Sequence, residues 1–227
     1  MDEPPQPTIA SIRIAGRGRQ RIVVLTDGRE FLFSEEAYAR IHPKEGDDAA
    51  LLEALDHAEQ HVVAHGAALR LLSHRPRSES EMRMRLAMRG IAPATIEDEV
   101  VRLRDAGLLN DDQFARAWVE NRKQTAPRGR RMLRYELLGR GIKPEAVDAV
   151  TSDVDDVATA LELARRRARS VPKDNYEAFV GKVGGFLRRR GFDYEVASRA
   201  TREAWTEATA GEPQNSDRDG SSGDPGA

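Results

Sequence analysis

Three histidines have the spacing that comes closest to a metal site in this chain. His57, His61 and His65 lie at positions i, i+4 and i+8 of a stretch with helical periodicity, so two of them could share the face that zinc-binding helices use. However, His65 also falls on the apolar side of that helix, and no cysteine or obvious carboxylate accompanies the other two. We therefore predict packed or solvated histidines, with no metal and no other cofactor.

No combination of residues matches a catalytic site. The chain has no cysteine, which excludes a thiol nucleophile, a thiolate zinc site and a disulfide framework. Gly16-Arg17-Gly18 lies between two expected strands with no helix after it, so it is better explained as a hairpin tip than as a phosphate-binding loop. Carboxylates gather at expected helix N-termini, where the helix dipole favours them. We predict that the protein is not an enzyme.

Clustered arginines are the stronger functional signal. The segment from Arg122 to Lys143 contains eight basic side chains and a single acidic one, Glu136. Such a cluster is typical of a surface that binds a polyanion or a partner with acidic patches, and the alternative is a solvated face without a partner. From charge alone, we predict that the partner-binding residues are Arg75, Arg77, Arg122, Lys123, Arg128, Arg130, Arg131, Arg134, Arg188, Arg189 and Arg190.

The net charge of -2 conceals a segregation of charge along the chain. Residues 70–143 and 165–202 each carry a net charge of +7, whereas 144–164 carries -6 and the two ends carry -5 each. The near-neutral total therefore arises from alternating blocks. Alternation of this kind suits an extended polyanion or a partner that presents both signs of charge.

The first segment is the only one with strand character. Strand-forming patterns, either β-branched residues or alternation of apolar and polar residues, occur at residues 9–14, 22–26 and 30–33. Between the last two, Asp27-Gly28 predicts a two-residue type I′ turn. Ser34 is the expected N-cap of a short helix that ends before Pro43. No apolar run reaches the ~18 residues of a membrane span, and the N-terminus is acidic, so we expect a cytoplasmic protein.

From residue 49 onwards the signals of helix ends repeat. Three glycines, spaced 51 and 50 residues apart, each follow an arginine and precede an apolar residue, which is the pattern of a Schellman C-cap. A fourth such cap would place Leu108 on Leu103, and a capping box begins a helix after Pro76. The expected structural caps are Ser78, Glu81, Gly90, Gly107, Gly141 and Gly191. This period indicates tandem units of three helices.

These patterns divide the chain into five parts and predict a mainly α protein. We predict a β-hairpin with a short helix and linker over 1–48, and a first three-helix repeat with a long lead helix over 49–108. Two further three-helix repeats follow over 109–153 and 154–205. The Gly-, Ser- and Asp-rich residues 206–227 predict a disordered tail.

Four stretches of the chain form a recognisable set: LLSHRPRSESEM, GLLNDDQFA, RGRRML followed by Glu136-Leu137, and FLRRRGF, at residues 71–82, 107–115, 128–137 and 186–192. Together they resemble the RecX family, the regulatory proteins that act on the RecA recombinase. The resemblance covers about residues 57–205, and the N-terminal hairpin and helix resemble the extra segment of longer family members. It implies that the three repeats form an elongated, curved array.

The resemblance also implies a function. Family members lodge in the helical groove of the RecA-DNA filament and lower strand exchange, ATP hydrolysis and LexA co-cleavage, which modulates DNA repair and the SOS response. The expected partner is thus the RecA filament, with single- or double-stranded DNA contacted through its backbone. We expect a monomer with no membrane association.

An alternative from another class is a direct DNA-binding module. In that case one helix of each repeat would enter the major groove, as in helix-turn-helix proteins. The nearest candidate helices begin with Pro93-Ala94 and Lys143-Pro144 and lack the polar N-terminal residues that usually read bases. The sequence therefore favours the filament regulator, with DNA binding dominated by the backbone.

Overall fold

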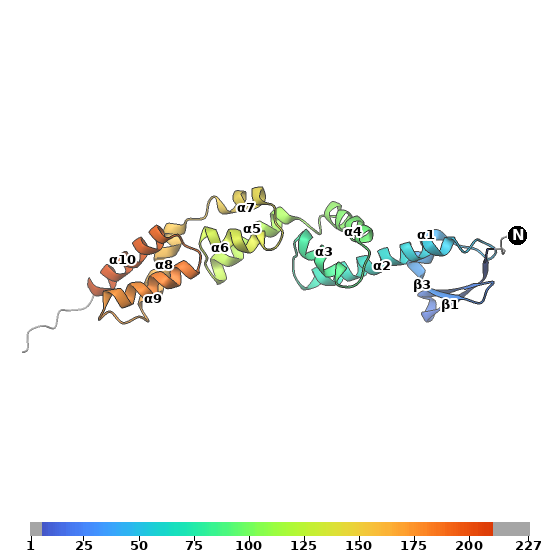
Figure 1. Ribbon diagram of the computed structural model, residues 1–227, viewed down its shortest axis with the longest axis horizontal. Coiled ribbons are helices and arrows are strands. Elements are labelled where there is room, and N and C mark those ends of the chain that lie inside the picture. The colour runs from blue at the N-terminus through green and yellow to red at the C-terminus, as the bar shows by residue number, and fades with distance from the viewer. Residues whose placement is uncertain (1–5, 211–227) are drawn as a thin grey trace, which may run out of the picture. The chain divides into compact units, whose positions relative to one another are not determined.

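The computed structural model describes residues 6–210 (Figure 1). The chain divides into two compact units, Met1–Phe114 and Ala115–Ala227. In the described residues the chain forms three strands and ten α-helices, which confirms the mainly α class with a small N-terminal sheet. No helix in this part of the chain is long and apolar enough to cross a membrane. Most of the predicted disordered tail, from residue 211 onwards, lies outside the described residues.

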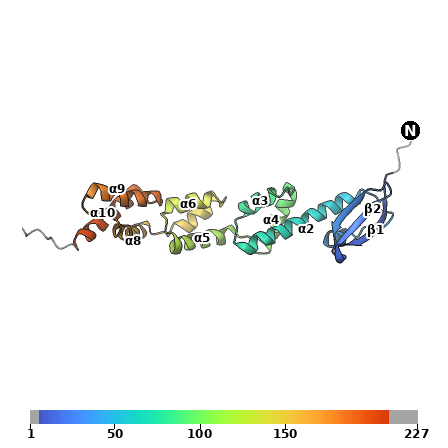
Figure 2. The same ribbon diagram turned by 90° about the horizontal axis from the view of Figure 1, so that it is seen from below.

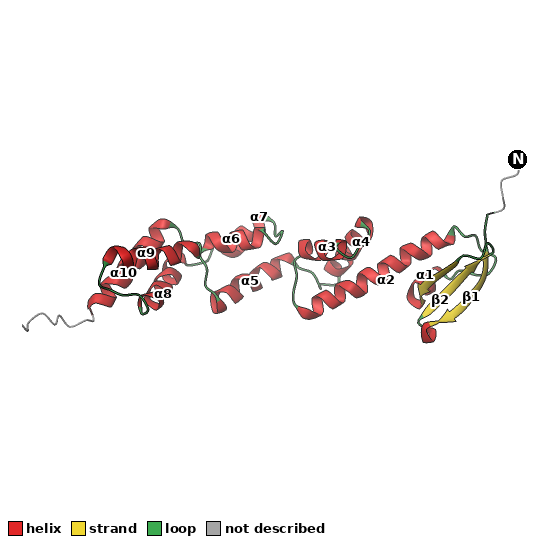
Figure 3. Cartoon of the chain, turned by 60° about the horizontal axis from the view of Figure 1, so that its bottom comes forward, coloured by secondary structure: helices red, strands yellow, loops and turns green. Residues whose placement is uncertain are grey.

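The first unit begins with an antiparallel sheet whose strands pair in chain order. The strands are β1 (Ile9–Ala15), β2 (Gln20–Leu25) and β3 (Glu30–Ser34). Val23 and Leu25 are two residues apart, so both point to the same face, and they are buried with Phe33. Leu55 from helix α2 (Leu51–His74) belongs to the same core. Figures 2 and 3 show the start of α2 beside the sheet.

The turn between β2 and β3 differs from the predicted type I′ turn. Of its residues only Gly28 has a positive φ, 86°, whereas a type I′ turn needs two. The amide of Gly28 donates to the carbonyl of Leu25 at 3.0 Å, and Leu25 donates to Arg29 at 2.9 Å. The loop is therefore one residue longer than predicted, with glycine in the left-handed position. A carboxylate oxygen of Asp27 accepts from the amide of Arg29, which favours this geometry.

The rest of the first unit is a short helix followed by the first three-helix repeat. Its helices are α1 (Glu35–Ile41), α2 (Leu51–His74), α3 (Glu79–Ala87) and α4 (Pro93–Asp105). The second half of α2 packs against α3 and α4, and Leu71, Met82 and Leu103 belong to their common core. Because α2 contributes to this core and also to the sheet core, it links the two parts of the unit.

The second unit contains the other two repeats. Helix α5 (Asp111–Thr125) begins in the first unit, and the remaining helices are α6 (Arg130–Leu138), α7 (Pro144–Thr151), α8 (Asp156–Ala168), α9 (Tyr176–Arg189) and α10 (Tyr194–Ala210). Helices α8, α9 and α10 contact one another in pairs (Figure 1). Phe179, Leu187 and Phe192 are fully buried in their core. The three tandem three-helix repeats are thus confirmed.

The predicted caps end and begin these helices. Gly90, Gly107, Gly141 and Gly191 all have positive φ, between 69° and 91°, and the amides of Leu108, Ile142 and Phe192 donate to the carbonyl five residues earlier, as in a Schellman motif. One detail of the prediction is wrong. Leu108 is 50% exposed, and the next residue, Leu109, is buried beside Leu103.

The N-terminal cap of α3 also forms. The Ser78 hydroxyl accepts a hydrogen bond from the amide of Glu81 at 3.1 Å, which confirms the first half of the predicted capping box. The Glu81 carboxylate in addition binds Arg75, with 2.9 Å between oxygen and Nη1. The cap of α3 therefore also fixes the turn that precedes it.

A second cap recurs from repeat to repeat. A carboxylate oxygen of Asp111 accepts from the amide of Glu79 at 2.8 Å, and one of Asp156 accepts from the amide of Arg130 at the same distance. In each case the first residue of a lead helix caps the middle helix of the preceding repeat. Burial raises the pKa of both aspartates, against the opposing effect of these hydrogen bonds.

Two glycines bring the second and third repeats into backbone contact. The amide of Gly129, at the start of α6, donates to the carbonyl of Arg190 at 2.9 Å. A Cβ on Gly129 would lie 2.5 Å from the carbonyl oxygen of Gly191, and a Cβ on Gly191 would overlap Met132. The contact requires glycine on both sides.

The last helix extends further than the sequence predicts. The predicted third repeat ends at residue 205, but α10 continues to Ala210. The added turn has few apolar residues and is held by polar contacts, since Arg165 binds Glu207 and the Thr209 hydroxyl donates to the carbonyl of Trp205 at 3.0 Å. Trp205 itself packs edge-on against Phe179.

Candidate binding surface

The two predicted residues of the first repeat close the turn between α2 and α3. Arg75 donates to the carbonyl of Pro76 at 2.9 Å and to the Glu81 carboxylate. Arg77 donates to the carbonyl of Leu71 at 3.1 Å, and burial, followed by the charge of Arg75, lowers its pKa. Both arginines therefore have a structural role, and Arg75 remains exposed beside it.

In the second repeat a single carboxylate organises the basic cluster. Glu136, whose side chain is 16% exposed, accepts from the indole of Trp118 at 2.8 Å and from Nε of Arg122 at 2.7 Å. Nε of Arg128 lies 3.7 Å from its other oxygen. The Trp118 ring in turn has Arg122 at 4.4 Å and Arg140 at 3.8 Å from its centroid, both within the range of cation–π attraction.

The arginines at the start of α6 do not form one free stripe. Arg130 donates to the carbonyls of Ser152 and Val154 at 3.1 and 3.0 Å, so its guanidinium caps the end of α7. Arg134 forms an ion pair with Asp148 of α7. Arg131 is exposed and forms no ion pair with any described residue. Of these three, Arg131 is the one whose whole guanidinium is available to a partner.

The three arginines that end α9 also differ from one another. Arg188 and Arg189 are exposed. Arg190 is half-buried, donates to the carbonyl of Pro127 at 3.1 Å and lies 4.6 Å from the centroid of the Phe186 ring. Lys123, on α5, is exposed and has only a distant contact, 3.8 Å, with the exposed Glu120. The structure thus leaves the basic groups of Lys123, Arg131, Arg188 and Arg189 open to solvent.

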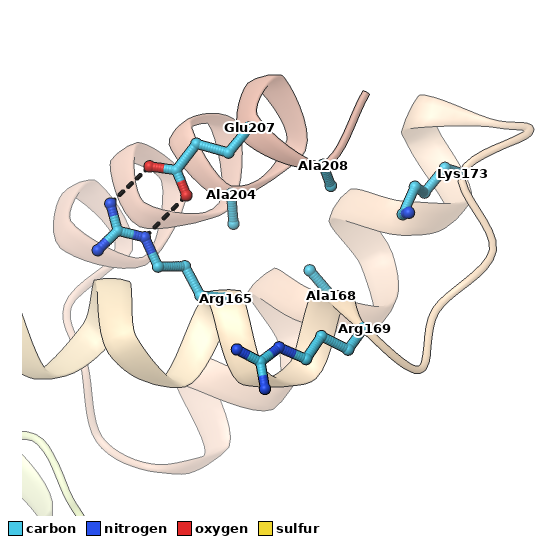
Figure 4. A pocket seen from close by; sticks show the side chains of 7 residues that line it. All are labelled: Arg165, Ala168, Arg169, Lys173, Ala204, Glu207 and Ala208. Atoms are coloured by element: carbon cyan, nitrogen blue, oxygen red, sulfur yellow. Dashed lines mark hydrogen bonds and ion pairs between the residues drawn. The ribbon is translucent and has the colours of Figure 1, made fainter. Parts of the chain in front are cut away.

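A hollow of about 280 Å³ between α8 and α10 belongs to the packing of the third repeat (Figure 4). Arg165 and Glu207 point toward one another at its side and form a bidentate pair of 2.7 and 2.5 Å. The pairing raises the pKa of Arg165 and lowers that of Glu207. Arg165 therefore ties α8 to α10.

The histidines of α2 contact carboxylates that the sequence did not indicate. Nδ1 of His65 lies 2.8 Å from the carboxylate of Glu99, which is 1% exposed, and His61 lies 3.7 Å from Asp98. Both carboxylates come from α4. Burial, and then the charge of His57, lowers the pKa of His61. Within residues 6–210 no group of three or more metal-ligating side chains comes together.

Sequence reasoning missed Trp118, the organising role of Glu136, and Glu99. The sequence does single out Glu136 as the one acidic residue between Arg122 and Lys143, but not its contacts, and Trp118 lies four residues before Arg122, the spacing of neighbours on a helix. Glu99 carried no signal, because its partner is 34 residues away in the sequence.

Comparison with known proteins supports the three-helix division. The family models for the first, second and third three-helix domains of RecX match residues 64–103, 110–150 and 153–201. A regulatory protein RecX from Streptomyces coelicolor is 31% identical over 147 residues, which are 63% of this chain and 78% of the relative. One from Listeria welshimeri is 28% identical over 206 residues, 88% of this chain and 76% of the relative.

Two crystal structures share the fold. A regulatory protein RecX matches with a TM-score of 0.65 and 22% identity, over 87% of this chain and 99% of its own. RecX from Lactobacillus salivarius matches with a TM-score of 0.59 and 24% identity, over 65% of this chain and 97% of its own. Since the three domain models together match more than half of the residues in chain order, the chain belongs to the RecX family of regulatory proteins.

Proposed function

We propose that this protein binds in the groove of the RecA-DNA filament and inhibits the recombinase, ATPase and co-protease activities of RecA. In doing so it modulates DNA repair and the SOS response in the cytoplasm, as a monomer without catalytic activity of its own. The observation that carries the proposal is the match of three consecutive RecX domains over residues 64–201. Tandem units of this kind suit a repeating target, because each can contact an equivalent site on it.

Exposed arginines support an electrostatic contact with such a filament. Arg131, Arg188 and Arg189 are exposed on α6 and α9, and arginine binds both phosphates and carboxylates through its planar donors. Arg77, Arg130 and Arg134 also bind their own chain. We propose that the exposed arginines Arg131, Arg188 and Arg189 supply most of the contact energy with the filament. The other predicted arginines mainly maintain the local structure.

A titration of the protein into RecA assembled on single-stranded DNA tests the function. We expect substoichiometric amounts to lower the rate of ATP hydrolysis and to shorten the filaments. Unchanged hydrolysis and filament length would contradict the proposal. Binding to bare duplex DNA at the same concentrations, with RecA activity unaffected, would instead support the direct DNA-binding alternative.

Charge reversal tests the residue assignment. We expect Arg131→Glu, combined with Arg188→Glu and Arg189→Glu, to weaken inhibition by roughly tenfold or more, since repulsion replaces each charge-assisted hydrogen bond to the filament. Arg199→Glu combined with Arg202→Glu is the control, because both arginines are exposed on α10 and lie outside the predicted set. Equal inhibition by the folded triple variant and the control would show that the filament contacts other residues of the chain.

A further inference from the structure

A second hollow, of about 310 Å³, lies between the second and third repeats inside the second unit. Its walls come from the segment that joins α5 to α6, from α8 and from α9. Arg166, Arg167 and Arg190 line it together with the apolar side chains of Leu163 and Phe186, and none of the lining residues is acidic. Three positive charges therefore surround a recess that is half apolar.

The positive charges of this hollow are poorly compensated. Arg190 uses one donor on the carbonyl of Pro127, which carries no charge. Arg166 pairs with Glu162 one helical turn away, but both side chains are about two-thirds exposed, at 65% and 69%, where such pairs contribute little. Burial, and then the charges of Arg128 and Arg166, lowers the pKa of Arg190. A bound anion would relieve this repulsion.

We propose that this hollow binds an acidic side chain of a partner protein, with Arg166 and Arg167 contacting its carboxylate and Leu163 and Phe186 contacting its apolar stem. A glutamate or aspartate within an apolar peptide has both parts that match these walls, since carboxylates pair with guanidinium groups and methylene groups pack on apolar side chains. The proposal deepens the proposed function and rests on it in so far as the partner belongs to the filament.

The geometry favours a peptide over a nucleic acid. A phosphodiester would pair with the arginines but has no apolar stem to pack against Phe186, which is half-buried. The guanidinium groups of Arg167 and Arg190 lie over the Phe186 ring, at 5.9 and 4.6 Å from its centroid, where a nucleobase would have to stack. A recess bounded by the Phe186 ring and the guanidinium groups of Arg167 and Arg190 therefore suits a single side chain better than a nucleic-acid strand.

Binding of a labelled peptide tests the site without RecA or DNA. The probe is a short fluorescent peptide that repeats Glu-Leu-Gly, and its anisotropy is followed as the full chain is added. We expect the double variant Arg166→Glu, Arg167→Glu to weaken binding by roughly tenfold or more. The control, Arg199→Glu with Arg202→Glu, makes the same change in net charge on exposed positions of α10 and should bind as the unmodified chain does.

Three results would overturn the proposal. They are equal binding by the double variant and the control, equal binding of a peptide with glutamine in place of glutamate, and displacement of the peptide by oligothymidylate but not by unlabelled peptide. If charge reversal lowers the melting temperature, the milder double variant Arg166→Gln, Arg167→Gln replaces it in the binding measurement. If the unmodified chain inhibits RecA but does not bind the peptide, this site alone is rejected, whereas peptide binding without RecA inhibition would reject the filament proposal alone.

Discussion

At the scale of single residues, the partners of each arginine decide what it can do. Glu136 binds Trp118 and Arg122 directly and lies near Arg128, so much of the second repeat's basic cluster depends on one half-buried carboxylate. Arg131 is exposed on the same helix. Neighbouring arginines thus divide between holding the repeat together and facing solvent.

Removal of the Glu136 carboxylate should destabilise the second unit. We expect Glu136→Ala to lower the free energy of unfolding by about 1–3 kcal/mol, because Trp118 and Arg122 lose a charged acceptor in a partly buried place. Urea denaturation measures this. Glu120→Ala is the matched control, also in a helix but 59% exposed, and should change stability by no more than about 0.5 kcal/mol. Equal effects of the two variants would show that the Glu136 contacts contribute nothing.

His65 offers a second test at this scale. We expect His65→Ala to cost about 1.5–3 kcal/mol, since it leaves the buried carboxylate of Glu99 without the contact that His65 makes. The neighbouring exposed Val63→Ala is the control in the same helix. Urea unfolding at a single pH compares them, and a cost no greater than that of the control would contradict the assigned role.

At the scale of elements, the same cap recurs where one repeat meets the next. Asp111 and Asp156 both cap the middle helix of the repeat before them, although burial raises their pKa. A carboxyl whose pKa is higher in the folded than in the unfolded protein stabilises the fold at low pH, and this contribution is lost as the pH rises through the folded pKa.

Asparagine in place of these aspartates should therefore change the pH dependence of stability. Asp111→Asn and Asp156→Asn each keep an oxygen that can accept the backbone hydrogen bond but carry no buried charge. Relative to the unmodified chain, we expect their free energy of unfolding to increase as the pH is raised from about 4, near the unfolded value for aspartate, to neutrality. Asp112→Asn, an exposed neighbour, is the control. A difference that stays constant with pH would contradict this account.

Most elements were predictable from the sequence, whereas the state of the binding residues was not. Gly90, Gly141 and Gly191 end helices through local backbone geometry, which sequence neighbours reveal. Arg130 and Arg134 bind groups of α7, and Glu99 meets His65 across the first repeat. Such pairings depend on tertiary packing, which periodicity does not encode. The predicted turn at Asp27-Gly28 failed for a smaller reason, one residue of loop length.

At the scale of the whole molecule, the total of -2 reflects alternating blocks of charge. A chain with this balance is attracted to anionic surfaces only where its basic blocks face them, and salt screens that attraction. Elongated, curved stacking of the repeats remains a prediction of the resemblance.

Salt should accordingly weaken binding to the filament in proportion to the charges engaged. We expect the logarithm of the apparent affinity for RecA on single-stranded DNA to fall linearly with the logarithm of salt concentration. Arg131→Gln, Arg188→Gln and Arg189→Gln together should reduce the slope by roughly 0.7 for each phosphate that is no longer neutralised. Arg199→Gln with Arg202→Gln should leave it unchanged. An identical slope in both variants would place these arginines outside the binding surface.

The paired glycines between the second and third repeats have a consequence for cooperativity. Gly129 and Gly191 interlock without side chains, and Gly191 also ends α9. Unfolding of either repeat therefore removes the hydrogen bond from Gly129 to the carbonyl of Arg190, which lies at a helix end of the other. We infer that these two repeats unfold in a single transition, so that a destabilising substitution in one repeat lowers the melting temperature of both.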